Sequence, residues 1–292
     1  MEGKSDEVNE NDGEEEDKQE TSNPIVNIRF PDLISRSAVD NIYADMGRDY
    51  YWSKDWSPEM YALQAVRGFI AVGYTSGIDH LLLPQIQRSY CILNFDRLEP
   101  NSRVVKRLKK YQKKLRLCIN KNFCEILEAV HLYHGEDSWL SLPYRAVCEE
   151  LYRRGDMYVE VDGKTVVFRM CSVGLYAEEE LVAGELGYAI GGVFTSLTGF
   201  TNTTLTPSLS IGLIQILSLI KVLEVSGFSF LNLGHPPSST AMRYKQQIGG
   251  EIVDRSDFIT LWEASIYPAS PPVNPCAFSY DCDDVAALFK TA

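Results

Sequence analysis

Hydrophobic and polar positions in the second half of the chain alternate with the spacing of helices in some segments and with that of strands in others, and so predict a definite order of elements. A helix is expected over 141–155, where Val147 and Leu151 share one face. Strands are predicted over 158–161, 166–176, 181–188 and 193–195, with a hairpin signal at Asp162 and Gly163. An apolar helix over 207–225, a strand over 228–233, a polar helix over 238–248 and a last strand over 258–263 complete the series.

The first half is less regular but contains one well-defined helix start. Ser57 and Pro58 provide an N-cap and a first helical residue, and an apolar stripe follows. Further strands are predicted over 23–30, 81–83, 90–95 and 115–119, and further helices over 101–115 and 122–133. The series indicates an α+β protein with a mixed sheet, and its second half resembles an acetyltransferase-like (GNAT-type) domain. We therefore predict a small N-terminal α/β domain over 25–88 and a GNAT-type domain over 89–268.

Charge is distributed unevenly along the 292 residues, whose formal net charge is −12. Residues 1–24 hold ten acids and two lysines, so the rest of the chain carries only −4. Because this acidic tail has almost nothing apolar to bury, we expect it to be disordered. The last segment, 269–292, is Pro-rich and then acidic, and we predict it to be a C-terminal tail.

The sequence contains no signal for export or membrane insertion. The longest apolar run, 209–225, is interrupted by Gln215, Lys221 and Glu224 and is short for a membrane span. Seven scattered cysteines without a Cys-x-x-Cys pair indicate free thiols rather than disulfides or a zinc site. We therefore expect a cytoplasmic protein that uses no metal or cofactor and does not bind a membrane.

The segment 103–116 is a basic stretch in an otherwise acidic protein. Eight of its fourteen residues are cationic, namely Arg103, Lys106, Arg107, Lys109, Lys110, Lys113, Lys114 and Arg116. On a helix with Val105, Leu108 and Leu115 turned inward, these cations would suit the neutralisation of nucleic-acid phosphates. A solvated, lysine-rich helix without a ligand is the alternative.

Three further segments are candidates for chemistry, and each has a structural alternative. Trp139, which ends the polar loop 134–139, could stack on a nucleic-acid base or fill a core position. His235 could act as a general base or be an ordinary loop residue. The glycine-rich stretch 181–194 could approach acetyl-CoA, or its glycines could mark β-bulges. The sequence has no Ser-His-Asp, P-loop or metal signature.

A collinear set of motifs extends over about residues 42–263. It comprises W-S-P-E-M-Y (56–61) with R-G (67–68), P-x-x-x-R (84–88), the basic helix at 102–114, G-E-D-S-W-L-S (135–141) with R-G (154–155), L-V-A-G-E-L-G (181–187) with G-G-V-F (191–194), F-L-N (230–232) and 239–249. This set resembles the leucyl/phenylalanyl-tRNA–protein transferase family. Members of that family move a large apolar amino acid from its charged tRNA to the N-terminal amine of a protein beginning with Arg or Lys, which marks that protein for degradation.

The resemblance implies roles for particular residues. The tRNA acceptor stem would contact Arg103, Lys106, Arg107, Lys110 and Lys114, and Trp139 would stack on the terminal adenosine. A pocket for the amino-acid side chain would be formed by Phe194, Ile216, Leu219, Leu223 and Leu231. Asn232 would orient the nucleophile, and His235 is a second catalytic candidate.

Two positions that are acidic in the family differ in this chain. The family has Asp-x-Gln after the strand, with both side chains implicated in catalysis, whereas this chain has Asn232, Leu233 and Gly234. The family also has Cys-Gly-Glu-Ser after the aromatic, whereas this chain has Thr195–Thr198, so Leu197 stands at the glutamate position. Positioning alone can supply roughly 7–11 kcal/mol of a barrier. The loss of these acids therefore does not by itself exclude transfer.

We predict a monomeric aminoacyltransferase that moves Leu or Phe from charged tRNA to the N-terminus of an acceptor protein, as N-degron marking. Two alternatives stay open. One is a catalytically degenerate relative that binds tRNA or a degron, and the other is an acetyl-CoA-dependent N-acetyltransferase.

Overall fold

The computed structural model describes residues 25–98, 102–110, 114–135, 138–204, 210–269, 272–273 and 280–289. Nine strands of this described part form one sheet. Its order is β12 (Glu251–Asp254), β5 (Ser89–Asn94), β11 (Phe230–Asn232), β10 (Val193–Thr201), β9 (Glu180–Ile190), β8 (Lys164–Ala177), β6 (Leu115–Ile119) and β13 (Tyr280–Cys282), with β7 (Met157–Val161) also paired to β8. Among the described strands of this sheet, only β10 and β11 run parallel to each other. The predicted α+β class with a mixed sheet is confirmed.

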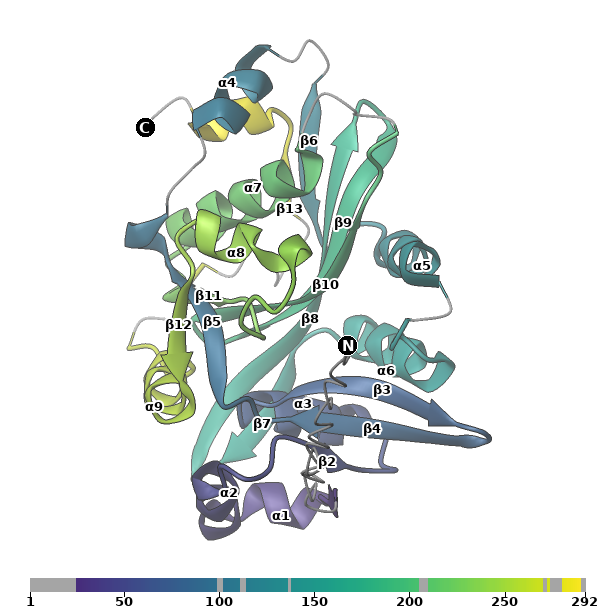
Figure 1. The fold of residues 1–292 in the computed structure, drawn as a ribbon, viewed down its shortest axis with the longest axis vertical. Coiled ribbons are helices and arrows are strands. Elements are labelled where there is room, and N and C mark those ends of the chain that lie inside the picture. The colour runs from purple at the N-terminus through teal and green to yellow at the C-terminus, as the bar shows by residue number, and fades with distance from the viewer. Residues whose placement is uncertain are drawn as a thin grey trace, which may run out of the picture.

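Helices cover both faces of the sheet (Figure 1). On one face α5 (Phe123–His134) packs against β8, β9 and β10, and α6 (Leu142–Arg154) packs against β8. On the other face α7 (Ile211–Val225) packs against β9 and β10. Each layer has its own buried cluster, one containing Ile126 and Phe168 and the other containing Phe194 and Leu219. The sheet therefore separates two hydrophobic cores.

The predicted strand over 258–263 is wrong, because these residues lie in α9 (Arg255–Ser265). Phe258 and Trp262 are four residues apart and both buried, as one helix face requires. Phe258 stacks on Tyr90 with 3.6 Å between the ring centroids, and the Trp262 indole N–H donates to the Val66 carbonyl at 2.8 Å. The strand propensity of Phe, Ile and Thr obscured this helical spacing. The strand at this point of the chain is β12, immediately before α9.

Smaller elements of the N-terminal part lie at one end of the sheet. They are β1 (Val26–Asn27), α1 (Phe30–Ile34), α2 (Arg36–Ala44), β2 (Tyr51–Trp52), α3 (Pro58–Val66), β3 (Ile70–Ser76) and β4 (Asp79–Gln85). Ser57 caps α3 as predicted, since its hydroxyl accepts a hydrogen bond from the Met60 N–H at 3.2 Å. The predicted strand over 23–30 is shorter, because α1 already begins at Phe30. Tyr61 of α3 and Tyr144 of α6 share a hydroxyl hydrogen bond of 2.7 Å, so this part shares a core with the large sheet.

The basic stretch forms two elements rather than one long helix. α4 (Ser102–Lys110) presents Val104 and Leu108 to the core, while Val105 is only half-buried and Leu115 already belongs to β6. The helix predicted over 101–115 is therefore too long, and its inward face is turned by one residue. Part of the predicted C-terminal tail joins the fold, because β13 pairs with β6 and η5 (Val285–Phe289) packs against α4 and α7. The acidic tail, 1–24, lies outside the described residues.

No helix among the described residues has the length and apolar character needed to cross a bilayer.

Candidate active site

A cavity of about 480 Å³ lies where β9 and β10 meet the start of α7, the end of α5 and α8 (Tyr244–Gln247). The pairing of β9 with β10 shifts register between Ser196 and Thr198, and the bulge residue Leu197 lines the cavity. Leu197, Phe200 and Ile216 form apolar walls. Glu185, Gln215 and Lys245 add polar groups. The combination of apolar walls and a few polar groups is typical of small-molecule sites.

Glu185 is a buried carboxylate in the wall of this cavity. Its side chain comes from the middle of β9, where the residue is only 5 % exposed. One oxygen, Oε2, accepts a hydrogen bond from the Gln215 amide at 2.9 Å, whereas Oε1 is buried without a hydrogen-bond partner among the described residues. Burial raises the pKa of Glu185 to about 7, against the opposing effects of Ser196, Gln215 and Lys245. Glu185 is therefore able to exchange a proton near neutral pH.

Lys245 places a cation at the same cavity. Its Nζ donates to the backbone carbonyls of Leu233 and His235 at 2.7 and 2.9 Å. Burial lowers the pKa of Lys245, while Glu185 acts in the opposite direction. The loop after β11 therefore fixes a buried ammonium group at the cavity wall.

Four of the five residues predicted to form the side-chain pocket lie in the hydrophobic core. Phe194, Leu219, Leu223 and Leu231 are completely buried, and of the predicted five only Ile216 lines the cavity described above. A Cβ on Gly187 would stand 2.7 Å from the Phe194 ring, so glycine at this position of β9 leaves room for that ring. Gly187 is thus a close-packing position, and Gly191 and Gly192 connect β9 to β10. The register shifts of β9 lie elsewhere, at Val182 against β8 and opposite Leu197 of β10.

The two predicted catalytic residues also make internal contacts. Asn232 is buried in β11, where its amide donates to the Thr195 hydroxyl at 3.3 Å and its Oδ1 accepts from the Gly234 N–H at 2.9 Å. His235 Nε2 lies 2.8 Å from Gln85 Oε1 and 3.1 Å from Gln87 Nε2. Burial lowers the pKa of His235. Neither residue lines the cavity, whereas His134 at the end of α5 does.

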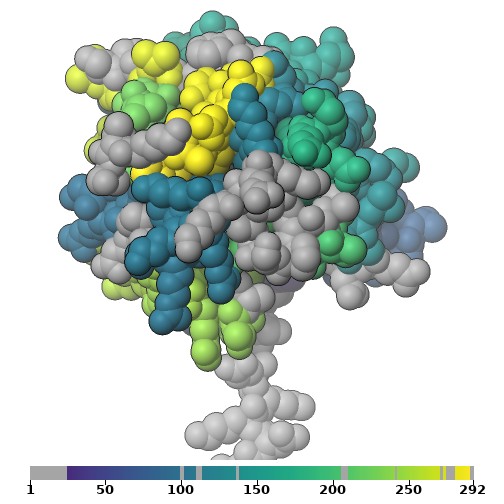
Figure 2. Space-filling model, turned by 90° about the horizontal axis from the view of Figure 1, so that it is seen from above, coloured from purple at the N-terminus to yellow at the C-terminus, as the bar shows by residue number. Residues whose placement is uncertain are grey.

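The predicted RNA-binding cations lie on α4 and just before β6. Arg103, Lys106 and Arg107 are exposed on α4, and Lys114 is exposed just before β6. The Lys110 side chain lies outside the described part. Figure 2 looks down on this end of the molecule and shows α4 at the surface beside the chain over 280–289. Arg116 belongs to β6 instead, where its guanidinium lies 4.9 Å from the Tyr176 ring centroid.

Trp139 lies between α5 and α6, at a shallow cavity that also includes Tyr74 of β3. Its ring packs edge-on against Tyr144 with 4.8 Å between the centroids, and it is half-buried. The last turn of α5 supplies His134 to the Glu185 cavity and His131 to the Trp139 cavity. Both cavities therefore adjoin the last turn of α5.

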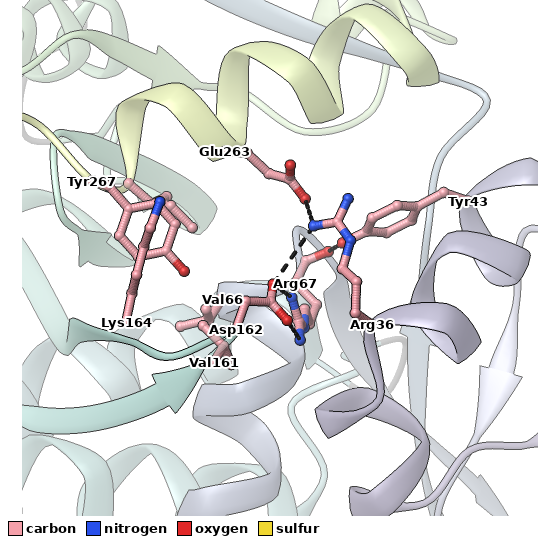
Figure 3. A pocket seen from close by; sticks show the side chains of 10 residues that line it. Arg36, Tyr43, Val66, Arg67, Val161, Asp162, Lys164, Glu263 and Tyr267 are labelled. Carbon is pink, nitrogen blue, oxygen red and sulfur yellow. Dashed lines mark hydrogen bonds and ion pairs between the residues drawn. The ribbon is translucent and has the colours of Figure 1, made fainter.

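A third cavity, of about 200 Å³, is lined by residues that form ion pairs with one another (Figure 3). Arg67 Nη1 and Nη2 donate to the Asp162 carboxylate at 2.6 and 3.0 Å, and Arg36 bridges Asp162 and Glu263. The Arg67 guanidinium holds the pKa of Asp162 below its usual value. The network joins α2, α3, α9 and the turn between β7 and β8, where Asp162 and Gly163 form the predicted hairpin. Because these charges satisfy one another, we interpret this cavity as a structural junction.

Three polar residues of this cavity were not predicted as site residues from the sequence, namely Glu185, Gln215 and Lys245, although two of them left a signal in it. Glu185 is the charged residue inside the otherwise uncharged strand segment 181–190, and Gln215 interrupts an apolar helix. A polar side chain at a position predicted to be buried needs either an internal partner or a ligand. Lys245, in a polar helix, left no such signal.

The fold and the site together define a class of protein, an α+β protein with a small-molecule-sized cavity on a mixed sheet and a cationic helix in the adjoining layer. Comparison with known families identifies it further. The model of the family described as leucyl/phenylalanyl-tRNA protein transferase matches residues 92–263, and the chain belongs to this family. The resemblance found from the motifs is thereby confirmed. Membership indicates an aminoacyl-tRNA-dependent transferase. No curated protein matches the chain.

Proposed function

We propose that this protein transfers Leu or Phe from charged tRNA to the N-terminal amine of an acceptor protein, and so marks that protein for degradation. The observation that carries the proposal is the family match, because residues 92–263 include α4, Trp139 and all the residues that line the Glu185 cavity. We further propose that the protein acts as a monomer, with a GNAT-type domain over 89–268 and a smaller domain over 25–88. The parallel pair of β10 and β11, connected through α7, supports this architecture.

The Glu185 cavity is the proposed seat of the aminoacyl group. Its volume of about 480 Å³ falls in the usual range for small-molecule pockets. Leu197, Phe200 and Ile216 offer apolar surface to a Leu or Phe side chain. The predicted pocket residues Phe194 and Leu219 share a buried cluster with Ile216, so we propose that they fix the shape of this wall from beneath.

We propose that the acceptor end of the tRNA passes over the last turn of α5 and occupies the cavities that adjoin it. An adenosine stacked on Trp139 would lie beside one cavity, and the amino acid attached to it would extend past His134 into the other. Base stacking on an aromatic side chain contributes roughly 1–3 kcal/mol. The exposed cations Arg103, Lys106 and Arg107 of α4 would neutralise phosphates of the acceptor stem.

We propose that Asn232 and His235 act by positioning rather than by contact with the reacting atoms. Asn232 fixes the turn after β11 through the Gly234 N–H, and the backbone carbonyls of this loop hold Lys245 at the cavity. The reaction itself is the attack of an amine on an ester, which needs orientation more than a cofactor. A loop that holds a cation beside the ester would support that orientation.

A filter assay tests the function and separates it from the two alternatives. The full chain is mixed with tRNA charged with radiolabelled Leu or Phe and with a peptide that begins with Arg. Label that moves to this peptide, and not to the same peptide with an acetylated N-terminus, is the expected result. Retention of charged tRNA without transfer would indicate a non-catalytic binding protein. Transfer that occurs only from acetyl-CoA would indicate an N-acetyltransferase.

A further inference from the structure

We propose that Glu185 is the proton acceptor for the incoming amine, an assignment that rests on the proposed aminoacyl transfer. The geometry points to it because Glu185 combines deep burial, an oxygen without a partner and a place in the cavity wall. Leu197, which stands where a glutamate was expected from the family resemblance, lies on the neighbouring strand β10 and lines the same cavity. Glu185 of β9 and Leu197 of β10 therefore line the same cavity.

The hydrogen bonds of Glu185 leave one position for a ligand. Gln215 donates to Oε2 and holds the carboxylate in place. Ser196 lies near enough to lower the pKa of Glu185, but no described residue meets the geometry of a hydrogen bond to Oε1. A buried carboxylate oxygen without a hydrogen bond is unfavourable in the empty protein. An ammonium group that enters the cavity can donate to this oxygen, so binding of the acceptor amine supplies the missing hydrogen bond.

The groups around Glu185 fit the transfer of a proton from an amine. Those from the surrounding elements are Tyr133 and His134 of α5, Ser196 of β10, Gln215 of α7, and Tyr244 and Lys245 of α8. Burial disfavours the charged carboxylate and brings its pKa to about 7, close to that of a protein N-terminal amine, about 7.7–8.0. A general base acts best when its pKa lies near the working pH. Glu185 meets this condition.

The transfer moves one proton of the acceptor ammonium to Glu185 and a second one to the leaving oxygen. The acceptor ammonium gives one proton to Glu185, and the freed nitrogen lone pair attacks the carbonyl carbon of the aminoacyl ester. A C–N bond forms, the bond between the carbonyl carbon and the ribose oxygen breaks, and the leaving oxygen takes the second proton of the attacking nitrogen. Glu185 then releases its proton to solvent. The products are an amide and an uncharged tRNA with a free hydroxyl group.

Glu185→Gln in the full chain tests the assignment. Gln keeps the size of the side chain and an oxygen for Gln215, but it cannot accept the proton. We expect the single-turnover rate of transfer to an Arg-initiated peptide to fall by about 100- to 10,000-fold, with retention of charged tRNA on filters unchanged. The wild-type rate should rise with pH through an inflection near 7, whereas in Glu185→Gln only the inflection of the acceptor amine itself, at about 7.7–8.0, should remain. Glu179→Gln, an exposed residue in the turn between β8 and β9, is the matched control.

Several outcomes would overturn the assignment. An active wild type with an equally active Glu185→Gln variant and the same pH profile would remove Glu185 from catalysis while the proposed function stands. A change confined to the KM for the peptide, with kcat intact, would make Glu185 a binding residue only. A wild type that transfers no label at any pH would overturn the proposed function, and this inference with it. Glu185→Asp should recover part of the rate and restore the inflection, and a failure to do so would also contradict it.

Discussion

Replacing Glu185 by Gln should stabilise the folded protein relative to the wild type by an amount that grows as the pH rises from 4.5 through 7. The pKa of this carboxyl rises from an ordinary 4.5 to about 7 because the group is buried. Between these two values the unfolded chain loses the proton while the folded chain keeps it, so ionisation favours unfolding as the pH rises. A shift of one pKa unit corresponds to about 1.4 kcal/mol. The free energy of unfolding of the wild type therefore falls by about 3 kcal/mol between low pH and pH 8, and about 1 kcal/mol of this fall has already occurred at pH 5. Gln does not ionise and avoids this loss.

Urea unfolding of both proteins at pH 5, 6.5 and 8 measures the effect. The free energy of unfolding of Glu185→Gln minus that of the wild type should grow with pH by about 2 kcal/mol across this range. Glu179→Gln corrects for the loss of one negative charge, because Glu179 is exposed. A difference that stays constant from pH 5 to pH 8 would show that Glu185 titrates normally and that burial does not raise its pKa. This measurement requires no tRNA and no activity.

Three other predictions follow from separate parts of the structure. The charge reversals Lys106→Glu and Arg107→Glu on exposed α4 should weaken binding of charged tRNA and flatten its salt dependence; an unchanged slope of affinity against salt concentration would remove α4 from the interface. Trp139→Ala should weaken the binding of charged tRNA by about 1–3 kcal/mol, measured by filter retention, and equal affinity would exclude stacking at this site. Asp162→Asn leaves the buried Arg67 guanidinium without its carboxylate and should lower the free energy of unfolding by about 2–3 kcal/mol, measured in urea, and an unchanged midpoint would contradict the role of this ion pair.

Periodicity alone predicted most of the central sheet. The strand over 115–119 coincides with β6, and the helix over 122–133 differs from α5 by one residue at each end. These segments have one buried face and a clear spacing, so local pattern and tertiary contacts agree. β3 was missed because its outer half, from Gly73 to Ser76, is largely exposed and its pairing with β4 supplies the stabilisation. In α9, strand propensity and helical spacing conflict, and packing against Tyr90 and Val66 determines the outcome.

The site was harder to predict because its walls come from distant parts of the chain. His134, Glu185 and Lys245 meet only when α5, β9 and α8 come together, and no local motif contains all three. The resemblance directed attention to Phe194 and Leu231, which belong to the same layer but lie in its core. A family motif locates a strand well, yet which face of that strand lines a cavity depends on the bulge at Leu197.

Four charged side chains are buried in the described part of the chain, and their hydrogen bonds distinguish structural roles from chemical ones. Arg255 donates to the carbonyls of Gln87 and Ile86 and to Asp49, and Arg67 pairs with Asp162. Lys245 donates to two carbonyls, whereas Glu185 keeps an oxygen without a partner. The fold thus satisfies buried charge where the role is structural. A carboxylate that lowers stability at neutral pH and faces a cavity is explained by a ligand that donates to it, and the acceptor amine is the donor that this family's reaction provides.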